Sequence, residues 1–127
     1  MELEDPLGYL ALVNTFLGNE SGTDVESALR RTIISRLYYG VFHHIKLKLF
    51  GINNDKPITH QKLKAAAQKF VDKNGININI KDHLSELEKK REIADYKRFP
   101  VIDEKFLNDT LTIFKIVKKD CEKIWGH

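Results

Sequence analysis

Hydrophobic residues recur at intervals of three and four along most of the chain, which is the spacing of one face of an α-helix. A first broad arc comprises Ile34, Leu37, Tyr38, Val41, Ile45 and Leu49. A second follows with Leu63, Ala66, Ala67, Phe70 and Val71, and a third with Phe106, Thr110, Phe114, Val117, Cys121 and Trp125. The alternation typical of a strand is confined to a short run at residues 76–80. The pattern therefore predicts an all-α protein.

Capping residues and helix breakers set the limits of five expected helices. Asp5 before Pro6 opens the first, Thr23 with Glu26 opens the second, and Pro100 closes the fourth. Pro57 and Thr59 together open the third. In chain order the expected helices start and stop at Asp5 and Leu17, Thr23 and Gly51, Pro57 and Gly75, Asn79 and Phe99, and Asp103 and Trp125. Because the intervening loops are short, the expected fold is an antiparallel bundle of about five helices.

Length and composition fit one soluble domain spanning residues 1–127. The chain is 42% hydrophobic and 31% charged, and no run approaches the roughly 18 apolar residues of a membrane span. No signal peptide is visible at the N-terminus. The single cysteine, Cys121, cannot form an internal disulfide and lies on an apolar line, which favours an inert buried thiol. A cytoplasmic protein without membrane association is expected.

The charge is unevenly distributed along the chain. Residues 1–26 contain six acidic residues and no Lys or Arg. The remaining residues hold all 21 Lys and Arg against 12 Asp and Glu, a formal charge of +9. This asymmetry permits an anionic partner such as RNA or a nucleotide, although lysine-rich helices are more often simply solvated.

The longest expected helix carries a second, polar stripe opposite its apolar arc. Arg36, Tyr39, His43 and Lys46 follow one another at spacings of three, four and three. One interpretation is a solvated polar face, in which these side chains have no special role. The other is that a second copy of the chain covers the stripe, which would give a two-fold homodimer with both sites near the axis.

Arg91 is the second feature that requires an explanation. It lies on the stripe of Ile80, Leu84, Leu87 and Ala94, and Asp95 follows one turn later. An arginine is costly to bury unpaired, so it needs carboxylate, carbonyl or ligand partners. Either Arg91 and Asp95 form an internal ion pair that locks two helices together, or the guanidinium faces a crevice and binds phosphate.

Three segments together resemble a known family. They are RRTIISRLYYGVFHH at residues 30–44, Thr59 with His60, and KREIADY at residues 90–96. Their order and spacing are similar to the HEPN domain (higher eukaryotes and prokaryotes nucleotide-binding), in particular to its small single-domain prokaryotic branch.

The resemblance implies a four-helix core that commonly dimerises, with a polar site where the long helices meet. It also implies a minimal nucleotidyltransferase as a possible partner protein in a toxin–antitoxin pair, and a metal-independent ribonuclease activity in many members. The site residues that it implies are Arg36, Tyr39, His43, Arg91, Asp95 and Tyr96.

One departure from the family pattern bears on catalysis. Ribonuclease members carry a histidine four to six residues after the arginine, whereas Asp95, Tyr96 and Lys97 occupy those positions here. RNA cleavage through the 2′-hydroxyl needs a base and an acid, and an arginine supplies neither. Asp95 is a poor base beside an arginine, and a tyrosine ordinarily titrates near pH 10. His43 with Arg91 is therefore the candidate catalytic pair, and cleavage is expected to be slow or absent.

Other chemistries are disfavoured. His43 and His44 point about 100° apart on one helix, so they are poorly placed to share a metal ion. His60 and His83 are expected on the surface, and the sequence contains no phosphate-binding loop or dinucleotide fingerprint. We therefore expect neither a metal nor another cofactor. Three functions stay open: an RNA- or nucleotide-binding module, a metal-independent ribonuclease toxin, and a non-enzymatic helical interaction subunit.

Overall fold

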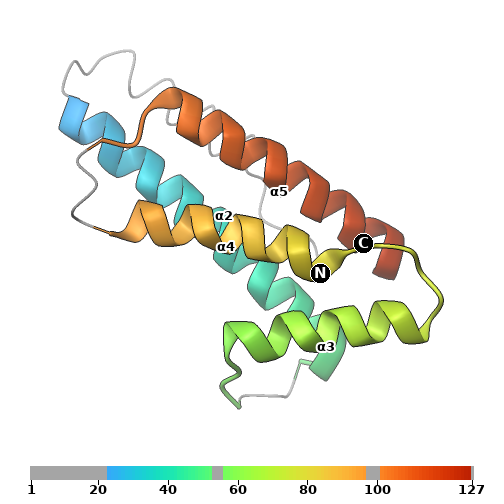
Figure 1. Cartoon of the computed structure of the whole chain (residues 1–127). Coiled ribbons are helices and arrows are strands. Elements are labelled where there is room, and N and C mark those ends of the chain that lie inside the picture. Colours follow the sequence, from blue (N-terminus) through green and yellow to red (C-terminus); the bar gives the residue numbers. More distant parts are fainter. Residues whose placement is uncertain (1–22, 53–55, 97–100, 127) are drawn as a thin grey trace.

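Four α-helices make up the part of the chain that the computed structural model describes, namely residues 23–52, 56–96 and 101–126 (Figure 1). They are α2 (Thr23–Phe50), α3 (His60–Lys73), α4 (Ile80–Asp95) and α5 (Glu104–Trp125). These ranges contain no strand, so the predicted all-α fold is confirmed. The helix expected from Asp5 to Leu17 lies outside the described residues.

The predicted capping residues begin three of the helices. The side chains of Thr59, Asn79 and Asp103 each accept a hydrogen bond from the backbone N–H three residues later, at 3.2, 3.4 and 2.8 Å. At the other end, Gly51 and Gly75 adopt φ angles of 88° and 68° after α2 and α3. Glycine is the residue that reaches this left-handed region without strain. Local sequence thus sets most helix boundaries.

The end of α4 differs from the prediction. We expected the helix to reach Phe99, but it ends at Asp95, and Tyr96 is already extended with φ −81° and ψ 119°. Arg31 of α2 donates hydrogen bonds to the carbonyls of Ala94 and Tyr96, at 2.5 and 3.1 Å. In a longer helix the carbonyl of Ala94 would accept from the N–H four residues later, so this tertiary contact takes the place of a helical hydrogen bond.

A second anchor holds the connection into α5 against α2. The buried hydroxyl of Ser27 accepts a hydrogen bond from the backbone N–H of Ile102 at 2.8 Å. Arg30 donates to the carbonyl of the same residue at 3.1 Å and pairs with Glu26 at 3.7 Å. The first turns of α2 therefore fix where α4 ends and where α5 begins.

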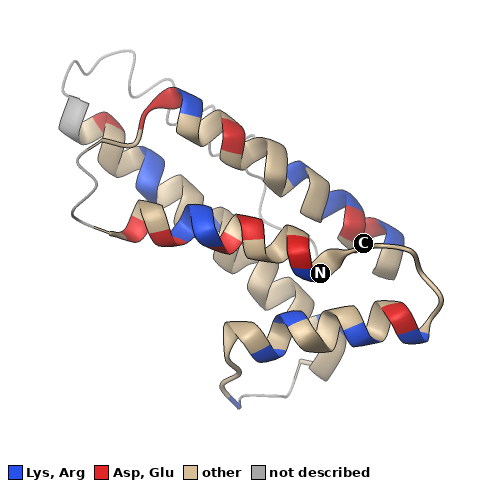
Figure 2. Ribbon diagram, in the orientation of Figure 1, with Lys and Arg blue, Asp and Glu red and all other residues tan. Residues whose placement is uncertain are grey.

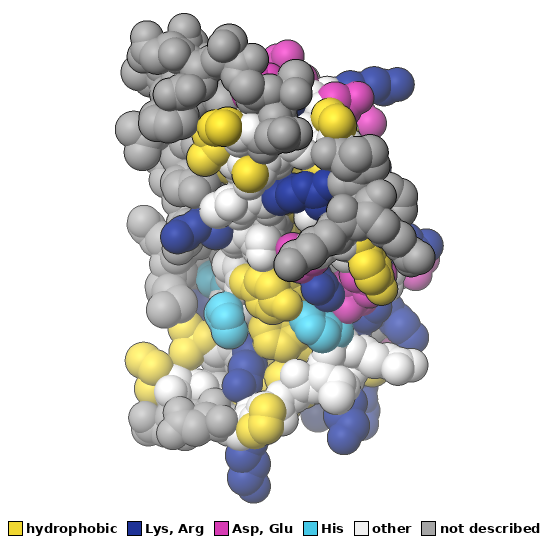
Figure 3. Space-filling view, turned by 90° about the vertical axis from the view of Figure 1, so that its left-hand side faces the viewer, with side chains coloured by type: hydrophobic (Ala, Val, Ile, Leu, Met, Phe, Trp, Pro, Cys, Tyr) yellow, Lys and Arg dark blue, Asp and Glu magenta, His cyan; other side chains and the backbone are white. Residues whose placement is uncertain are grey.

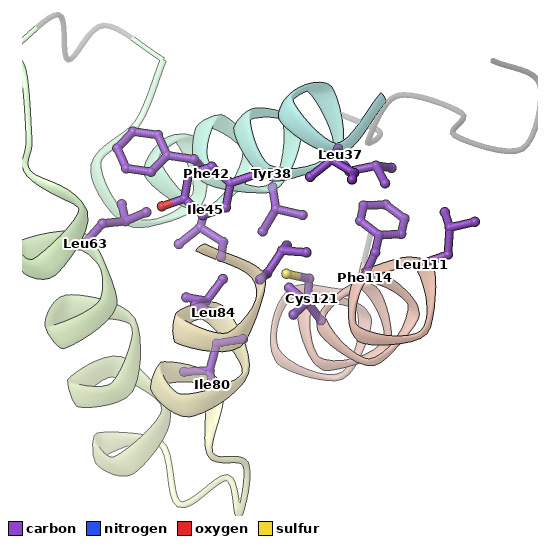
Figure 4. Close-up of a cluster of buried hydrophobic side chains, with 14 of the residues drawn as sticks. Leu37, Tyr38, Phe42, Ile45, Leu63, Ile80, Leu84, Leu111, Phe114 and Cys121 are labelled. Carbon is purple, nitrogen blue, oxygen red and sulfur yellow. The ribbon is translucent and has the colours of Figure 1, made fainter. Parts of the chain in front are cut away.

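The helix α4 packs against all three of the others. It runs in the opposite direction to α2 and α5, and α3 lies at one end of this layer (Figure 1). Apolar side chains of α2, α4 and α5 converge between the helices, and Leu63 of α3 joins them (Figure 4). None of the four described helices is long and apolar enough to cross a membrane.

The predicted core stripes are confirmed. On α2 the buried members are Ile34, Leu37, Tyr38, Val41 and Ile45, with Leu49 partly buried. On α5 they are Thr110, Phe114, Val117 and Cys121, with Phe106 and Trp125 partly buried. Burial raises the pKa of the Cys121 thiol to about 12, which keeps it protonated and unreactive, as expected.

His44 is a buried histidine that the sequence did not single out. Only 4% of its surface is exposed, and its Nδ1 has no hydrogen-bond partner among the described residues. Burial lowers the pKa of His44 below its ordinary value of 6.5, and the nearby Lys48 charge lowers it further. The folded chain therefore holds this imidazole neutral at pH values where the unfolded chain would protonate it.

We expect His44 to make the fold acid-sensitive. A group whose pKa is lower in the folded state contributes stability that is lost as the pH falls below its unfolded value, here near 6.5. Urea unfolding between pH 7.5 and 5.5 should show a falling free energy of unfolding, with a smaller fall in His44→Gln. The exposed neighbour provides the control, because His43→Gln should retain the parent slope. Equal slopes in the parent and His44→Gln would contradict the assignment.

Candidate functional site

Aromatic side chains gather where α2, α3 and α4 meet. We call this group the aromatic cluster, and its members are Tyr38, Tyr39, Phe42, His43 and His60. The Phe42 ring centroid lies 4.9 Å from that of His60 and 5.6 Å from that of His43. Tyr38 and Phe42 are buried, whereas the other three members are half-buried or exposed. On this face, histidine side chains lie on two sides of a hydrophobic patch (Figure 3).

Helical spacing explains how the cluster forms. Tyr38 and Phe42 belong to the buried side of α2, and Tyr39 and His43, four residues apart, lie together beside them. Tyr39 is not simply solvated, since its ring packs edge-on against Tyr38 with centroids 5.3 Å apart. The predicted polar stripe of α2 therefore packs against the core through the ring of Tyr39.

Arg91 of α4 completes this face. Its guanidinium carbon lies 5.3 Å from the ring centroid of Tyr38 and 5.6 Å from that of Tyr39. Only 16% of the side chain is exposed, and its Nε is buried without a hydrogen-bond partner in the described part of the chain. Such stacking over tyrosine faces is a favourable position for a cation. Arg91, which was singled out because it interrupts an apolar stripe, therefore contacts Tyr39 of the predicted polar stripe and Tyr38 of the predicted core.

Arg91 and Asp95 form an ion pair, but one that does not link two helices. Arg91 donates to the Asp95 carboxylate at 3.2 Å, and both residues belong to α4. Burial disfavours the charge on Arg91, yet the hydrogen bond to the Asp95 carboxylate raises its pKa above the ordinary value, so it stays charged. The Asp95 side chain is 42% exposed, so solvent and ligands can reach this ion pair from the Asp95 side.

The remaining predicted residues lie on the same two helices. Arg36 is exposed on α2 one turn before Tyr39, and Lys46 is half-buried one turn after His43. Tyr96 directly follows α4 and is 50% exposed. Ring contacts and the ion pair bring together Tyr39, His43, Arg91 and Asp95.

Sequence reasoning missed the role of His60. We expected His60 on the surface, but its side chain is only one-third exposed. Its Nδ1 is hydrogen-bonded to the Tyr38 hydroxyl. The same nitrogen lies 3.5 Å from Oε2 of Glu88, whose Oε1 accepts a hydrogen bond from Lys64 at 2.7 Å. Burial and the Glu88 charge raise the pKa of Tyr38, so its hydroxyl stays protonated. The signal was present, because His60 precedes Leu63 by one turn on the buried line of α3.

A second histidine expected on the surface also has a carboxylate partner. Nδ1 of His83 lies 2.5 Å from Oδ2 of Asp120, whose side chain is 10% exposed. This pair joins α4 to α5. It is best explained as a structural contact between helices.

The chemistry of the face suits a phosphate carried next to an aromatic base. A guanidinium and two imidazoles can donate hydrogen bonds to phosphate oxygens, and the rings of Tyr39 and His43 are accessible for stacking. Within the described ranges no three His, Cys, Asp or Glu side chains are grouped so that they could hold a metal ion. Comparison with protein-family models, with curated proteins and with solved structures finds no match to this chain.

Proposed function

We propose that this chain is an RNA- or nucleotide-binding module of the HEPN type, with weak or no catalysis of its own. The observation that carries the proposal is Arg91. Its guanidinium stacks over Tyr38 and Tyr39, and Asp95 is its only hydrogen-bond partner among the described residues. An arginine has five N–H donors, so several can still reach phosphate oxygens.

The charge around this face supports an anionic ligand. The helices α2 and α3 together carry nine Lys and Arg against three Asp and Glu. Acidic and basic segments alternate along α4, and α3 is mainly basic (Figure 2). Positive charge on the elements next to Arg91 would raise the local concentration of a phosphate-bearing ligand.

The partners implied by the resemblance belong to the same proposal. A minimal nucleotidyltransferase would form a toxin–antitoxin-like pair with this chain. A second copy would cover the Arg36, Tyr39 and His43 stripe in a two-fold homodimer. Support for a covering partner comes from His43, which is exposed although its ring contacts Tyr39 and Phe42.

The proposal is tested by Arg91→Ala. We expect affinity for a labelled single-stranded RNA to fall about tenfold or more, because a charge-assisted contact is lost. The slope of log affinity against log salt should also become shallower by about 0.7 to 1. Fluorescence anisotropy at several salt concentrations measures both. The matched control is Lys89→Ala, an exposed cation two residues earlier on α4, which should retain nearly the parent affinity.

The opposite outcome identifies a structural arginine. If Arg91→Ala leaves binding unchanged and instead costs about 3–5 kcal/mol of stability, the residue only supports the packing of α4. The chain would then be better described as a non-enzymatic helical interaction subunit. Urea unfolding of the same variant measures the stability.

A metal-independent ribonuclease is the second candidate. The observation that favours it is that the rings of His43 and His60 both contact Phe42, with centroids 5.6 and 4.9 Å from its own. Two imidazoles near one arginine could supply the base and the acid that cleavage through a 2′-hydroxyl requires.

A further inference from the structure

His60 is held in a fixed orientation by groups from two other helices. Its ring stacks on Tyr38 with centroids 5.4 Å apart and planes inclined by 29°. Its Nδ1 is engaged by the Tyr38 hydroxyl of α2 and faces the Glu88 carboxylate of α4 at 3.5 Å. Fixing one ring nitrogen in this way determines where the other nitrogen, Nε2, points.

Glu88 is itself held in place. Its Oε1 accepts a hydrogen bond from Lys64 at 2.7 Å, and Lys64 also donates to Ser85 at 3.2 Å. The other carboxylate oxygen, Oε2, is the one that faces His60. With only 14% of the Glu88 side chain exposed, its interaction with a protonated imidazole is weakly screened by solvent.

The Nε2 edge of His60 is left available. No residue of the described ranges bonds to it, and one-third of the side chain reaches solvent. In the imidazolium form Nε2 carries a proton and donates a charge-assisted hydrogen bond, which is about twice as strong as a neutral one. An anion at this edge would thus be bound mainly by the protonated state.

Arg91 lies close enough for both residues to serve one ligand. The His60 ring and the Arg91 guanidinium both contact the rings of Tyr38 and Tyr39. Figure 3 shows basic and acidic side chains beside one of the histidines that border the hydrophobic patch. A phosphate bound beside the partly exposed Tyr39 would meet donors from α3 and from α4.

Charged groups around His60 act in both directions. Glu88 favours the imidazolium, as does Glu92 on the same helix, whose charge acts on the neighbouring Tyr38. Arg91, Lys64 and the positive N-terminal end of α3 oppose it. From α2 the ring is faced by Tyr38 and Tyr39, and His43 contacts the same Phe42 ring as His60 does. A bound phosphate adds a further negative charge on the side where Nε2 points, so ligand binding and protonation should reinforce each other.

We propose that His60 is a second phosphate-binding residue of this face, active as an imidazolium oriented by Glu88 and Tyr38, so that RNA or nucleotide binding strengthens in mildly acidic solution. This inference rests on the proposed function, because it presumes that Arg91 binds the same phosphate. The competing explanation is that His60 and Glu88 only fasten α3 to α4, as His83 and Asp120 join α4 to α5.

The test is binding as a function of pH at constant ionic strength. For the parent we expect labelled single-stranded RNA to bind about tenfold more tightly at pH 5.5 than at pH 7.5. A parallel titration with ATP shows whether a free nucleotide behaves in the same way. His60→Gln should reduce the pH effect to less than about twofold, because glutamine cannot acquire the positive charge of an imidazolium. His83→Gln removes the other carboxylate-paired histidine and should keep the full effect.

A second measurement protects the test against a folding defect in the variant. Inorganic phosphate added to the parent at pH 6 should shift the imidazole NMR signals of His60 and leave those of His83 in place. An unchanged His60 signal, or a His60→Gln variant that keeps the parent pH dependence, overturns the inference. Failure of the proposed function is recognised differently, because then the parent binds no RNA at any pH, or Arg91→Ala binds as well as the parent.

Discussion

Replacing Leu87 with alanine should cost about 2–5 kcal/mol of unfolding free energy. Leu87 is fully buried on α4, the helix that packs against each of the other three described helices. Its truncation removes apolar contact and leaves a cavity that rigid neighbouring helices fill only partly. Urea unfolding followed by circular dichroism at 222 nm measures the loss.

The control for this prediction is Ile116→Ala on α5. Ile116 is 40% exposed, so the same kind of truncation should cost less than about 1 kcal/mol. A Leu87→Ala variant as stable as Ile116→Ala would mean that α4 is not enclosed by the other helices in solution. Both variants should keep the parent slope of unfolding free energy against urea, since the exposed surface on unfolding hardly changes.

Most of the described fold could be predicted because its determinants are local. The caps Thr59, Asn79 and Asp103 act on N–H groups three residues away, and the apolar stripes follow from helical periodicity alone. The early end of α4 could not be predicted in this way. It depends on Arg31, which is 63 residues distant in the sequence from the carbonyl of Ala94.

In the candidate site, too, features within one helix could be predicted and contacts between helices could not. Arg91 was recognisable because a charged residue on an apolar stripe violates the helical pattern. Its place over Tyr38 and Tyr39 was not, because the pairing of helix faces depends on how α2 and α4 cross. His60 was taken for a surface residue although its spacing from Leu63 indicated otherwise. Its contact with Glu88 could not be predicted, because no rule of spacing within one helix connects residues of two helices.

RNA cleavage by the purified chain is expected to be slow or absent when a chelator is present. Positioned acid–base groups contribute about 10²- to 10⁴-fold each to such reactions, and the histidine usual after the arginine is missing. Asp95 is engaged by Arg91, and Tyr38 keeps its proton because burial raises its pKa. Gel analysis of a labelled single-stranded RNA over several hours measures the rate.

Any activity that is detected should depend on His43. Its ring centroid lies 6.3 Å from that of Tyr39, over which Arg91 is stacked, so it is the exposed imidazole on the predicted row. We expect His43→Ala to reduce cleavage by about 10²-fold or more, whereas Asp95→Asn should change it little, since a carboxylate held by Arg91 is a poor base. Rapid metal-free cleavage that survives His43→Ala would contradict this assignment. If that cleavage were then lost in His60→Ala, the proton transfer would be assigned to His60 instead of His43.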